Sequence, residues 1–333
     1  MASELKYAVF GSGSWATAIV KMLCENLQTV HWYVRNPQTA HYIIVEKHNP
    51  SYLSSVEFDS KQLIISTDIN QAATAADVLI FAIPSAFLHA QIELMTVDVS
   101  AKIIVSAVKG ILPESGLLAG EYFHKIKKIP QDQVAVIGGP CHAEEVALER
   151  LSYLTIACKS KPNAEEIASK LSSHYIQTNT HDDVIGAEHA AMLKNIYAIA
   201  AGISHGLGYG DNFQSVLMSN AIREMKRYIK KVYKMKRKIN ETVYLGDLLV
   251  TGYSTFSRNR MFGNMIGKGY TVKSAQIEMS MVAEGYYATK SAFEINNKKA
   301  TPARTPIINA VYNILYHHQN PKQAFKALAN KLD

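Results

Sequence analysis

The 333-residue sequence has few cysteines and no long apolar segment. Its three cysteines, Cys24, Cys141 and Cys158, are far apart and form no CxxC pair. This argues against a disulfide framework and favours a reducing compartment, the cytoplasm. No apolar run approaches the ~18 residues that a membrane span requires, and the opening MASELKYAVF lacks the apolar core of a signal peptide. We therefore expect a cytoplasmic protein without stable membrane insertion.

Acidic residues are absent from one strongly basic stretch. Residues 226–238, KRYIKKVYKMKRK, carry eight Lys or Arg and no acid. The whole chain has a net charge of +7, so subtracting these eight leaves −1 elsewhere. Apolar residues recur at steps of three or four from Ile222 to Val232, which predicts an amphipathic helix over 213–238 with a basic outer face. This face is either simply solvated or contacts an acidic partner or membrane surface; no nucleic-acid module is recognised, and no nucleic-acid partner is expected.

The first half of the chain alternates between two patterns, without internal repeats or low-complexity tracts. Apolar, β-branched runs predict buried strands at 5–10, 29–34, 63–67, 77–83, 101–108, 133–138, 151–158 and 174–180. Helical patterns lie between them at 14–26, 86–95 and 163–173. This alternation predicts an α/β domain, a doubly wound sheet with right-handed crossovers.

The pattern changes near residue 183. Residues 182–206 form one long helical run, and strand signals almost vanish after it. Further helices are predicted at 213–238, 273–292 and 305–317. We therefore expect a Rossmann-like domain over 1–185, followed by an all-α domain over 186–333.

The segment FGSGSWATA has the spacing of a dinucleotide-binding loop. Gly11 follows an apolar strand, Gly13 precedes a helical pattern, and Ala16 supplies the third small residue. The first glycine permits a tight turn, and the second lets the backbone approach a pyrophosphate at the helix N-terminus. Trp15 is as well suited to the core as to a ligand. The alternative for the loop is a purely structural turn between strand and helix.

The acid expected about 20 residues after such a loop is absent. The second strand instead runs into Arg35, whose planar guanidinium suits the 2′-phosphate of NADP. The alternative is an arginine in a solvent-exposed turn. We expect NADPH to be accepted at least as well as NADH.

Lys194 lies in the long helical run among alanines. Five of its six neighbours at helical spacings of three, four and seven are alanine, which admits a flat ligand but provides no acid on the same face. Burial would favour the neutral amine and suit it to proton transfer. An equally acceptable interpretation is a lysine whose ammonium reaches solvent from a packed helix edge.

Other polar groups occur where ligands commonly bind. Lys109 ends one buried strand, and the segment GGPCHAEE at 138–145 follows the end of another. Further candidates are Asp247 in GDL and the consecutive Ser257, Arg258 and Asn259, which together suit an anion. No HExxH, Walker A or GxSxG motif is present, and no metal site is expected.

Several of these segments resemble one family. GSGSWATA, VKG at 108–110, GPCHAEE at 139–145, LKNIYAIAAGISHGLGYGDN at 193–212, GDL, STFSRN and VAEG at 282–285 occur in the order typical of bacterial NAD(P)-dependent glycerol-3-phosphate dehydrogenases. The resemblance covers nearly the whole chain. It implies reversible hydride transfer between sn-glycerol 3-phosphate and dihydroxyacetone phosphate, which supplies glycerol 3-phosphate for phospholipid synthesis, and a possible homodimer.

The resemblance also implies roles for individual residues. Lys194 is the expected catalytic proton acceptor. The expected NAD or NADP contacts are Gly11, Gly13, Ser14, Trp15, Arg35, Lys109, Ala143, Arg258 and Glu284. The expected substrate contacts are Lys109, Gly139, Cys141, Lys194, Asp247, Ser257, Arg258 and Asn259.

The chain departs from the family pattern at a few positions. Ala16 replaces a usual glycine, Cys141 a usual Ser or Thr, and Asn220 with Ala221 an Arg-Gly pair. A thiol is a weaker hydrogen-bonding group than a hydroxyl, so the departure at Cys141 bears on substrate affinity rather than on the chemistry. The alternatives are a β-hydroxyacid or sugar-acid dehydrogenase of the same two-domain plan, and a non-catalytic dinucleotide sensor.

Overall fold

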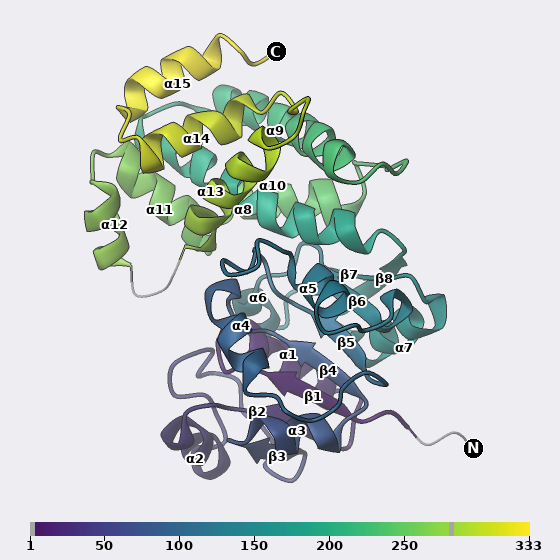
Figure 1. Ribbon diagram of the computed structural model, residues 1–333. Helices are drawn as coiled ribbons and strands as arrows, with labels where there is room; N and C mark the ends of the chain where they lie inside the picture. The colour runs from purple at the N-terminus through teal and green to yellow at the C-terminus, as the bar shows by residue number, and fades with distance from the viewer. Residues whose placement is uncertain (1–3, 280–282) are drawn as a thin grey trace. The chain divides into compact units, whose positions relative to one another are not determined.

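The computed structural model describes residues 4–279 and 283–333, and the chain divides into two compact units. The first comprises the residues up to Val108 together with Leu112–Glu188, and the second comprises Lys109–Ile111 and the described part of His189–Asp333. Figure 1 shows that the first unit contains a sheet flanked by helices, whereas the second is built of helices.

The sheet of the first unit has eight strands in the order β3-β2-β1-β4-β5-β6-β7-β8. All neighbouring pairs are parallel except β6 and β7. The strands are β1 Tyr7–Phe10, β2 Val30–Tyr33, β3 Leu63–Ser66, β4 Val78–Phe81, β5 Ile103–Ser106, β6 Val134–Gly138, β7 Ser152–Cys158 and β8 Ile176–His181. The order reverses between β1 and β4. Ligands of open α/β sheets bind outside the carboxyl ends of the strands at such a point.

Helices cover both faces of this sheet (Figure 1). They are α1 Ser14–Cys24, α2 Pro37–Glu46, α3 Ile69–Ala75, α4 Ser85–Glu93, α5 Ala119–Lys125, α6 Ala143–Ala147 and α7 Lys161–Leu171. One core lies under α1, α6 and α7, where Ile19, Val146 and Ile167 are fully buried. On the other face, Phe81 of β4 stacks on Phe10 of β1 and contacts the tilted ring of Phe123 in α5.

The regular elements among the described residues of the second unit are helices, joined by short non-helical segments. Its elements are most of α8 Val184–Gly206, then α9 Asp211–Val232, a π-helical turn η2 Thr242–Gly246, α10 Asp247–Tyr253, α11 Arg258–Gly267, α12 Val272–Glu278, α13 Glu284–Asn297, α14 Pro306–Tyr316 and α15 Pro321–Ala329. The division between the units falls within α8. The α/β fold followed by helices is the predicted fold class, which is thereby confirmed.

Two predicted helices are wrong in their extent. The helix predicted over 213–238 ends at Val232, and residues 234–238 are neither helix nor strand. Apolar spacing supported the helix only as far as Val232, so the basic residues beyond it carried no helical signal of their own. The helix predicted over 273–292 is two helices, since α12 ends at Glu278 and α13 begins at Glu284. Val282, part of the VAEG motif, lies outside the described residues.

Candidate functional site

The glycine loop leaves β1 at the point where the strand order reverses. Gly11 has φ +120°, and a Cβ there would lie 2.7 Å from the carbonyl oxygen of Ala82, just after β4. Only glycine fits this position without strain. A Cβ on Gly13 would meet nothing within 4 Å. The loop therefore has a tight turn followed by open space beside the backbone, as a dinucleotide-binding loop requires.

Helix α1 begins directly after this open position. Its N-cap, Gly13, has no side chain to cap the helix, and its first turn carries no acidic residue. The N-terminal end of the helix dipole therefore meets no neutralising side chain, which suits a pyrophosphate. Ser14 is buried in the first turn. Trp15 is partly buried and packs against the hydrophobic core.

Two residues that sequence reasoning missed, Trp32 and Asn49, hold the loop in place. Trp32 Nε1 of β2 donates a hydrogen bond to the Gly11 carbonyl at 2.6 Å. The fully buried Asn49 donates from Nδ2 to the Ser12 carbonyl at 3.0 Å and to Thr17 Oγ1 at 2.9 Å. No sequence motif contains these contacts, because they join residues more than 20 positions apart.

Arg35 lies exposed between β2 and α2. The next residue, Asn36, caps α2 by accepting a hydrogen bond from the Thr39 N–H at 2.9 Å. The Arg35 charge favours the ionised phenol of Tyr33, although burial dominates and raises the pKa of Tyr33. The guanidinium is thus accessible at the end of the second strand, where a ribose-recognising group is expected.

A second glycine turn follows β6. Gly139 has φ +108°, and a Cβ there would lie 2.8 Å from the Tyr153 carbonyl oxygen. Cys141 is buried, and Ala143 is the first residue of α6. Gly139 is a predicted substrate residue, but its positive φ and the close Tyr153 carbonyl already require glycine there.

In the second unit, Lys194 of α8 forms a buried ion pair with Asp247. The Lys194 ammonium donates to Asp247 Oδ1, and the two side chains are 7% and 3% exposed. Asp247 opens α10, directly after the π-helical turn that corresponds to TVYLG. The acid that the alanine-rich face of α8 lacks is therefore supplied by another helix. Because the Lys194 ammonium is buried and paired, it does not reach solvent from a helix edge, which was the alternative interpretation.

Lys109 belongs to the same charged group. Burial, and to a smaller extent the nearby positive charge of Lys194, lower its pKa to about 8 against the opposing effect of the Asp247 and Glu284 carboxylates. Arg258 also lowers this pKa. Asn195, next to Lys194 on α8, donates to the Lys109 carbonyl at 3.4 Å. The structure thus gathers three predicted cations and two predicted carboxylates in one unit.

The segment Ser257–Asn259 starts helix α11. Ser257 caps the helix by accepting a hydrogen bond from the Arg260 N–H at 3.3 Å. Asn259 Oδ1 accepts from the Gly285 N–H at 2.9 Å, which ties α11 to the start of α13 beside Glu284. A Cβ on Gly285 would lie only 2.6 Å from the Asn195 carbonyl oxygen. Sequence reasoning quoted Gly285 within the VAEG motif but gave it no role, because its need to be glycine arises where three helices meet.

Glycines also bring α8 and α11 into backbone contact. A Cβ on Gly202 would lie 2.0 Å from the Arg260 carbonyl oxygen, and one on Gly263 would lie 2.1 Å from the Ile199 carbonyl oxygen. Side chains larger than hydrogen would push the helices apart. This close crossing fixes the start of α11, and with it Arg258 and Asn259, against the helix that carries Lys194.

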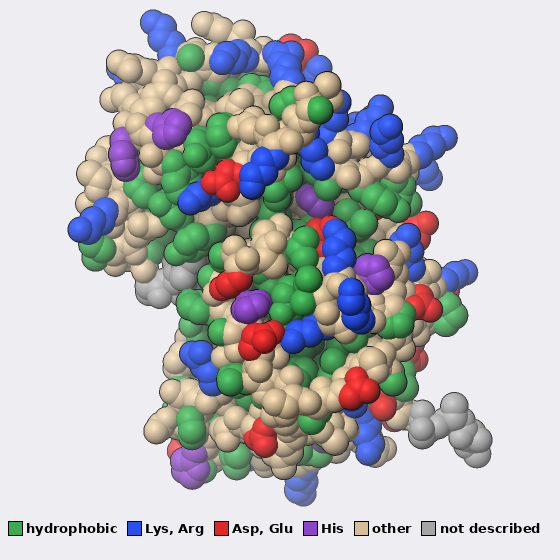
Figure 2. All heavy atoms as spheres, in the orientation of Figure 1, with side chains coloured by type: hydrophobic (Ala, Val, Ile, Leu, Met, Phe, Trp, Pro, Cys, Tyr) green, Lys and Arg blue, Asp and Glu red, His purple; other side chains and the backbone are tan. Residues whose placement is uncertain are grey.

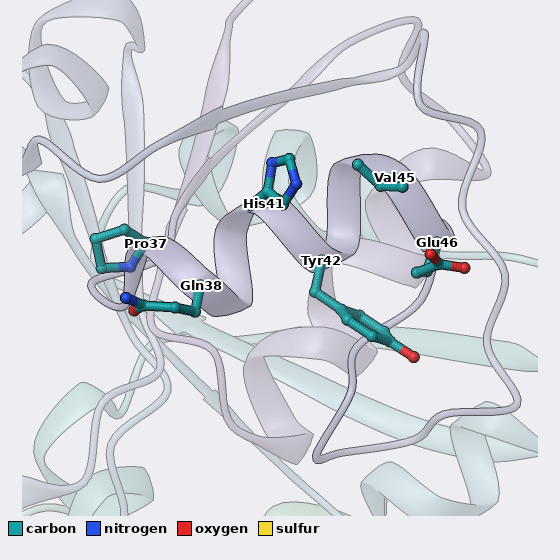
Figure 3. A pocket seen from close by; sticks show the side chains of 6 residues that line it. All are labelled: Pro37, Gln38, His41, Tyr42, Val45 and Glu46. Atoms are coloured by element: carbon teal, nitrogen blue, oxygen red, sulfur yellow. The ribbon is translucent and has the colours of Figure 1, made fainter.

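A surface hollow of about 380 Å³ lies elsewhere in the first unit, along one face of α2. It is lined by Pro37, Gln38, His41, Tyr42, Val45 and Glu46, whose side chains line the helix in Figure 3. None of these is a predicted site residue. Within residues 4–279 and 283–333, no group of three His, Cys, Asp or Glu side chains could hold a metal ion.

Comparison with known proteins identifies similar sequences and folds. Residues 6–164 match the model of the NAD-dependent glycerol-3-phosphate dehydrogenase N-terminus, and residues 183–326 that of its C-terminus. The chain is 34% identical to a glycerol-3-phosphate dehydrogenase (NAD(P)+) of Bacillus subtilis, over 97% of this chain and 93% of the relative. It is 35% identical to one of Latilactobacillus sakei, over 93% and 92%. A crystal structure of the Coxiella burnetii glycerol-3-phosphate dehydrogenase matches with a TM-score of 0.88 and 28% identity, over 98% of this chain and 99% of that one.

Proposed function

The chain belongs to the NAD-dependent glycerol-3-phosphate dehydrogenase family, and on that premise we propose that it interconverts sn-glycerol 3-phosphate and dihydroxyacetone phosphate. The observation in the structure that best supports this reaction is the buried Lys194–Asp247 pair, within a group that also contains Lys109 and Arg258. Such a group combines a proton-transfer residue with cations for a phosphorylated substrate. The alternative of a dinucleotide sensor does not require these side chains together.

The residues of the first unit fit NAD or NADP, which we propose as the cofactor. The open backbone at Gly13 and the uncapped start of α1 would accept the pyrophosphate, with Gly11 forming the turn. Arg35 would contact the adenosine end, and its guanidinium suits a 2′-phosphate. We place Ser14, Trp15 and Ala143 beside the cofactor as well, and give this unit the role of cofactor-binding domain. When bound, the nicotinamide donates or accepts the hydride at carbon 2 of the substrate.

The helical unit would then be the substrate and catalytic domain. Lys194 would hold a proton at the oxygen on carbon 2, donating it when dihydroxyacetone phosphate is reduced and accepting it in the reverse direction. Asp247 keeps the lysine paired while it is buried, and orients its ammonium. The positioned ammonium of Lys194 would thereby also polarise the carbonyl of dihydroxyacetone phosphate.

The phosphate end of the substrate would bind at the start of α11. Arg258 offers a planar fork, and Ser257 and Asn259 flank it at a helix N-terminus, where the dipole favours an anion. Lys109 would add a second positive charge. From the first unit we assign Gly139 and Cys141 to substrate contacts, and from the second Glu284 and Arg258 to additional cofactor contacts.

We further propose that the reaction supplies glycerol 3-phosphate for phospholipid synthesis in the cytoplasm. Cys24, Cys141 and Cys158 are all free thiols, the state expected in a reducing compartment. No helix within the described residues is long and apolar enough to cross a membrane. A homodimer remains a proposal, which sedimentation equilibrium tests directly.

The test is the oxidation of NADH and of NADPH on addition of dihydroxyacetone phosphate, followed by absorbance. We expect consumption that depends on both the substrate and the enzyme. If both cofactors bind but neither is oxidised, the sensor alternative is correct. If a β-hydroxyacid or sugar acid is turned over instead, the assignment of Arg258 and Asn259 to a phosphate is wrong.

A further inference from the structure

The basic stretch 226–238 forms a surface of its own on the helical unit. Arg227 and Arg237 turn toward the protein: Arg227 Nε donates to the Arg304 carbonyl at 3.1 Å, and Arg237 donates to the Tyr233 carbonyl at 2.9 Å. Lys231 donates to Thr301 Oγ1 at 3.0 Å. These three cations are used within the molecule, and Arg227 and Lys231 fasten α9 to the segment that follows α13.

The remaining five lysines of the stretch face solvent. Their side chains are all exposed, and within the part of the chain that the structure describes their ammonium groups make no ion pair or hydrogen bond. They are Lys226, Lys230, Lys234, Lys236 and Lys238. By contrast, Lys21, Lys125 and Lys170 elsewhere each pair with a glutamate. We call these five residues the lysine surface; Figure 2 shows Lys and Arg side chains gathered over the end of α9 and the segment after it.

The end of α9 at Val232 organises this surface. Two of the lysines lie on the outer face of the helix, whereas Lys234, Lys236 and Lys238 alternate with half-buried Met235, Arg237 and Ile239. The three lysines are thus the residues of this segment that face away from the protein. The helix dipole explains cations in the last turn of α9, but it does not explain three more beyond the helix.

The chemistry of the lysine surface indicates its partner. Lysine is a compact point charge, suited to a diffuse layer of negative charge, whereas arginine is preferred for bidentate contacts. No large hydrophobic side chain between residues 223 and 240 is strongly exposed, so nothing is available to insert into a bilayer or to stack on unpaired bases. We propose that the lysine surface binds the surface of an anionic lipid bilayer, peripherally and without insertion.

This proposal is independent of the enzymatic activity, because none of the five lysines belongs to the candidate active site. Each lysine close to an anionic bilayer strengthens binding about fivefold, a value that follows from ~1 kcal/mol per cation. Three lysines together should therefore strengthen binding to the bilayer about 100-fold. Because the attraction is between exposed charges, it should weaken as salt shortens the Debye length.

The experiment measures binding of the full-length protein to vesicles by co-sedimentation. The vesicles contain phosphatidylcholine alone or phosphatidylcholine with phosphatidylglycerol, at low and high salt. The test variant is Lys234→Gln/Lys236→Gln/Lys238→Gln. A matched control, Lys61→Gln/Lys273→Gln/Lys322→Gln, removes three exposed lysines that are scattered over the chain and so lowers the net charge equally.

We expect the unmodified protein to bind the anionic vesicles in a salt-dependent way and not to co-sediment with the neutral vesicles. The test variant should bind about 100-fold more weakly, and the control within a few fold of the unmodified protein. Circular dichroism and the reductase assay establish that both variants fold. The proposal is overturned if the anionic vesicles are not bound, or if the control loses as much as the test variant. Tighter binding to duplex DNA or RNA in a parallel titration would also overturn it, in favour of a nucleic-acid partner.

Discussion

Replacing Asp247 by asparagine should destabilise the helical unit more than its small change in shape suggests. The Asp247 side chain is 3% exposed and that of Lys194 is 7% exposed, so the substitution leaves a buried ammonium without this counter-ion. Breaking a buried pair by removing one partner costs ~3–5 kcal/mol. The asparagine oxygen still accepts a hydrogen bond, which favours the lower end, ~3 kcal/mol. For a domain of this size that corresponds to a fall in Tm of roughly 6–12 °C.

The assay is thermal unfolding followed by circular dichroism, in a double-mutant cycle with Lys194→Met. Each single variant removes the Lys194–Asp247 contact and leaves one of its two charges buried, whereas the double variant removes both charges. The two losses should therefore not add, and we expect a coupling of ~2–3 kcal/mol. The exposed pair between Lys161 and Glu165, at 3.5 Å, provides the control, since Glu165→Gln should cost less than ~1 kcal/mol. A loss for Asp247→Asn as small as this control, or strict additivity, would refute the reasoning.

Three further predictions concern the candidate active site. Arg258→Lys should raise the KM for dihydroxyacetone phosphate because the planar fork is lost; steady-state kinetics with an unchanged KM for substrate and cofactor would place Arg258 outside the site. Arg35→Asp should lower the ratio of kcat/KM for NADPH to that for NADH by roughly tenfold, since a charge-assisted contact is worth ~1.5–3 kcal/mol; an unaltered ratio would leave Arg35 as a surface residue. Because burial lowers the pKa of Lys109 to about 8, kcat/KM for dihydroxyacetone phosphate should fall as the pH rises through that value and Lys109 loses its charge. The decline should be absent in Lys109→Met, and its persistence there would assign it to another group.

The sheet was predictable because its signals are local. Buried parallel strands are continuous apolar runs, and a glycine turn after the first strand locates the point where the order reverses. The antiparallel direction of β7 was not predictable, since strand composition carries no information about direction. The end of α9 at Val232 was missed because positive charge alone does not distinguish a helix from an extended segment.

The individual residues of the candidate site could be predicted from the sequence, but the contacts between them could not. Lys194 and Asp247 were each recognisable, yet 53 positions separate them, and no spacing rule brings them together. For the same reason Asn49 was missed, and Gly285 was quoted in a motif without a role. Asn49 is one of many asparagines until its hydrogen bonds to the glycine loop are seen. Gly285 is required only because Asn195 and Asn259 approach it from two other helices.

The catalytic role of Lys194 is tested most directly by comparing the turnover of dihydroxyacetone phosphate by Lys194→Met with that by the unmodified protein. Methionine keeps most of the apolar stem and removes the proton-transfer group. We expect kcat for NADPH or NADH oxidation to fall by about 10²–10⁴, with cofactor affinity nearly unchanged in a fluorescence titration. A fall of only a few fold, with the protein folded and the cofactor bound, would contradict the role of Lys194 and the mechanism built on it.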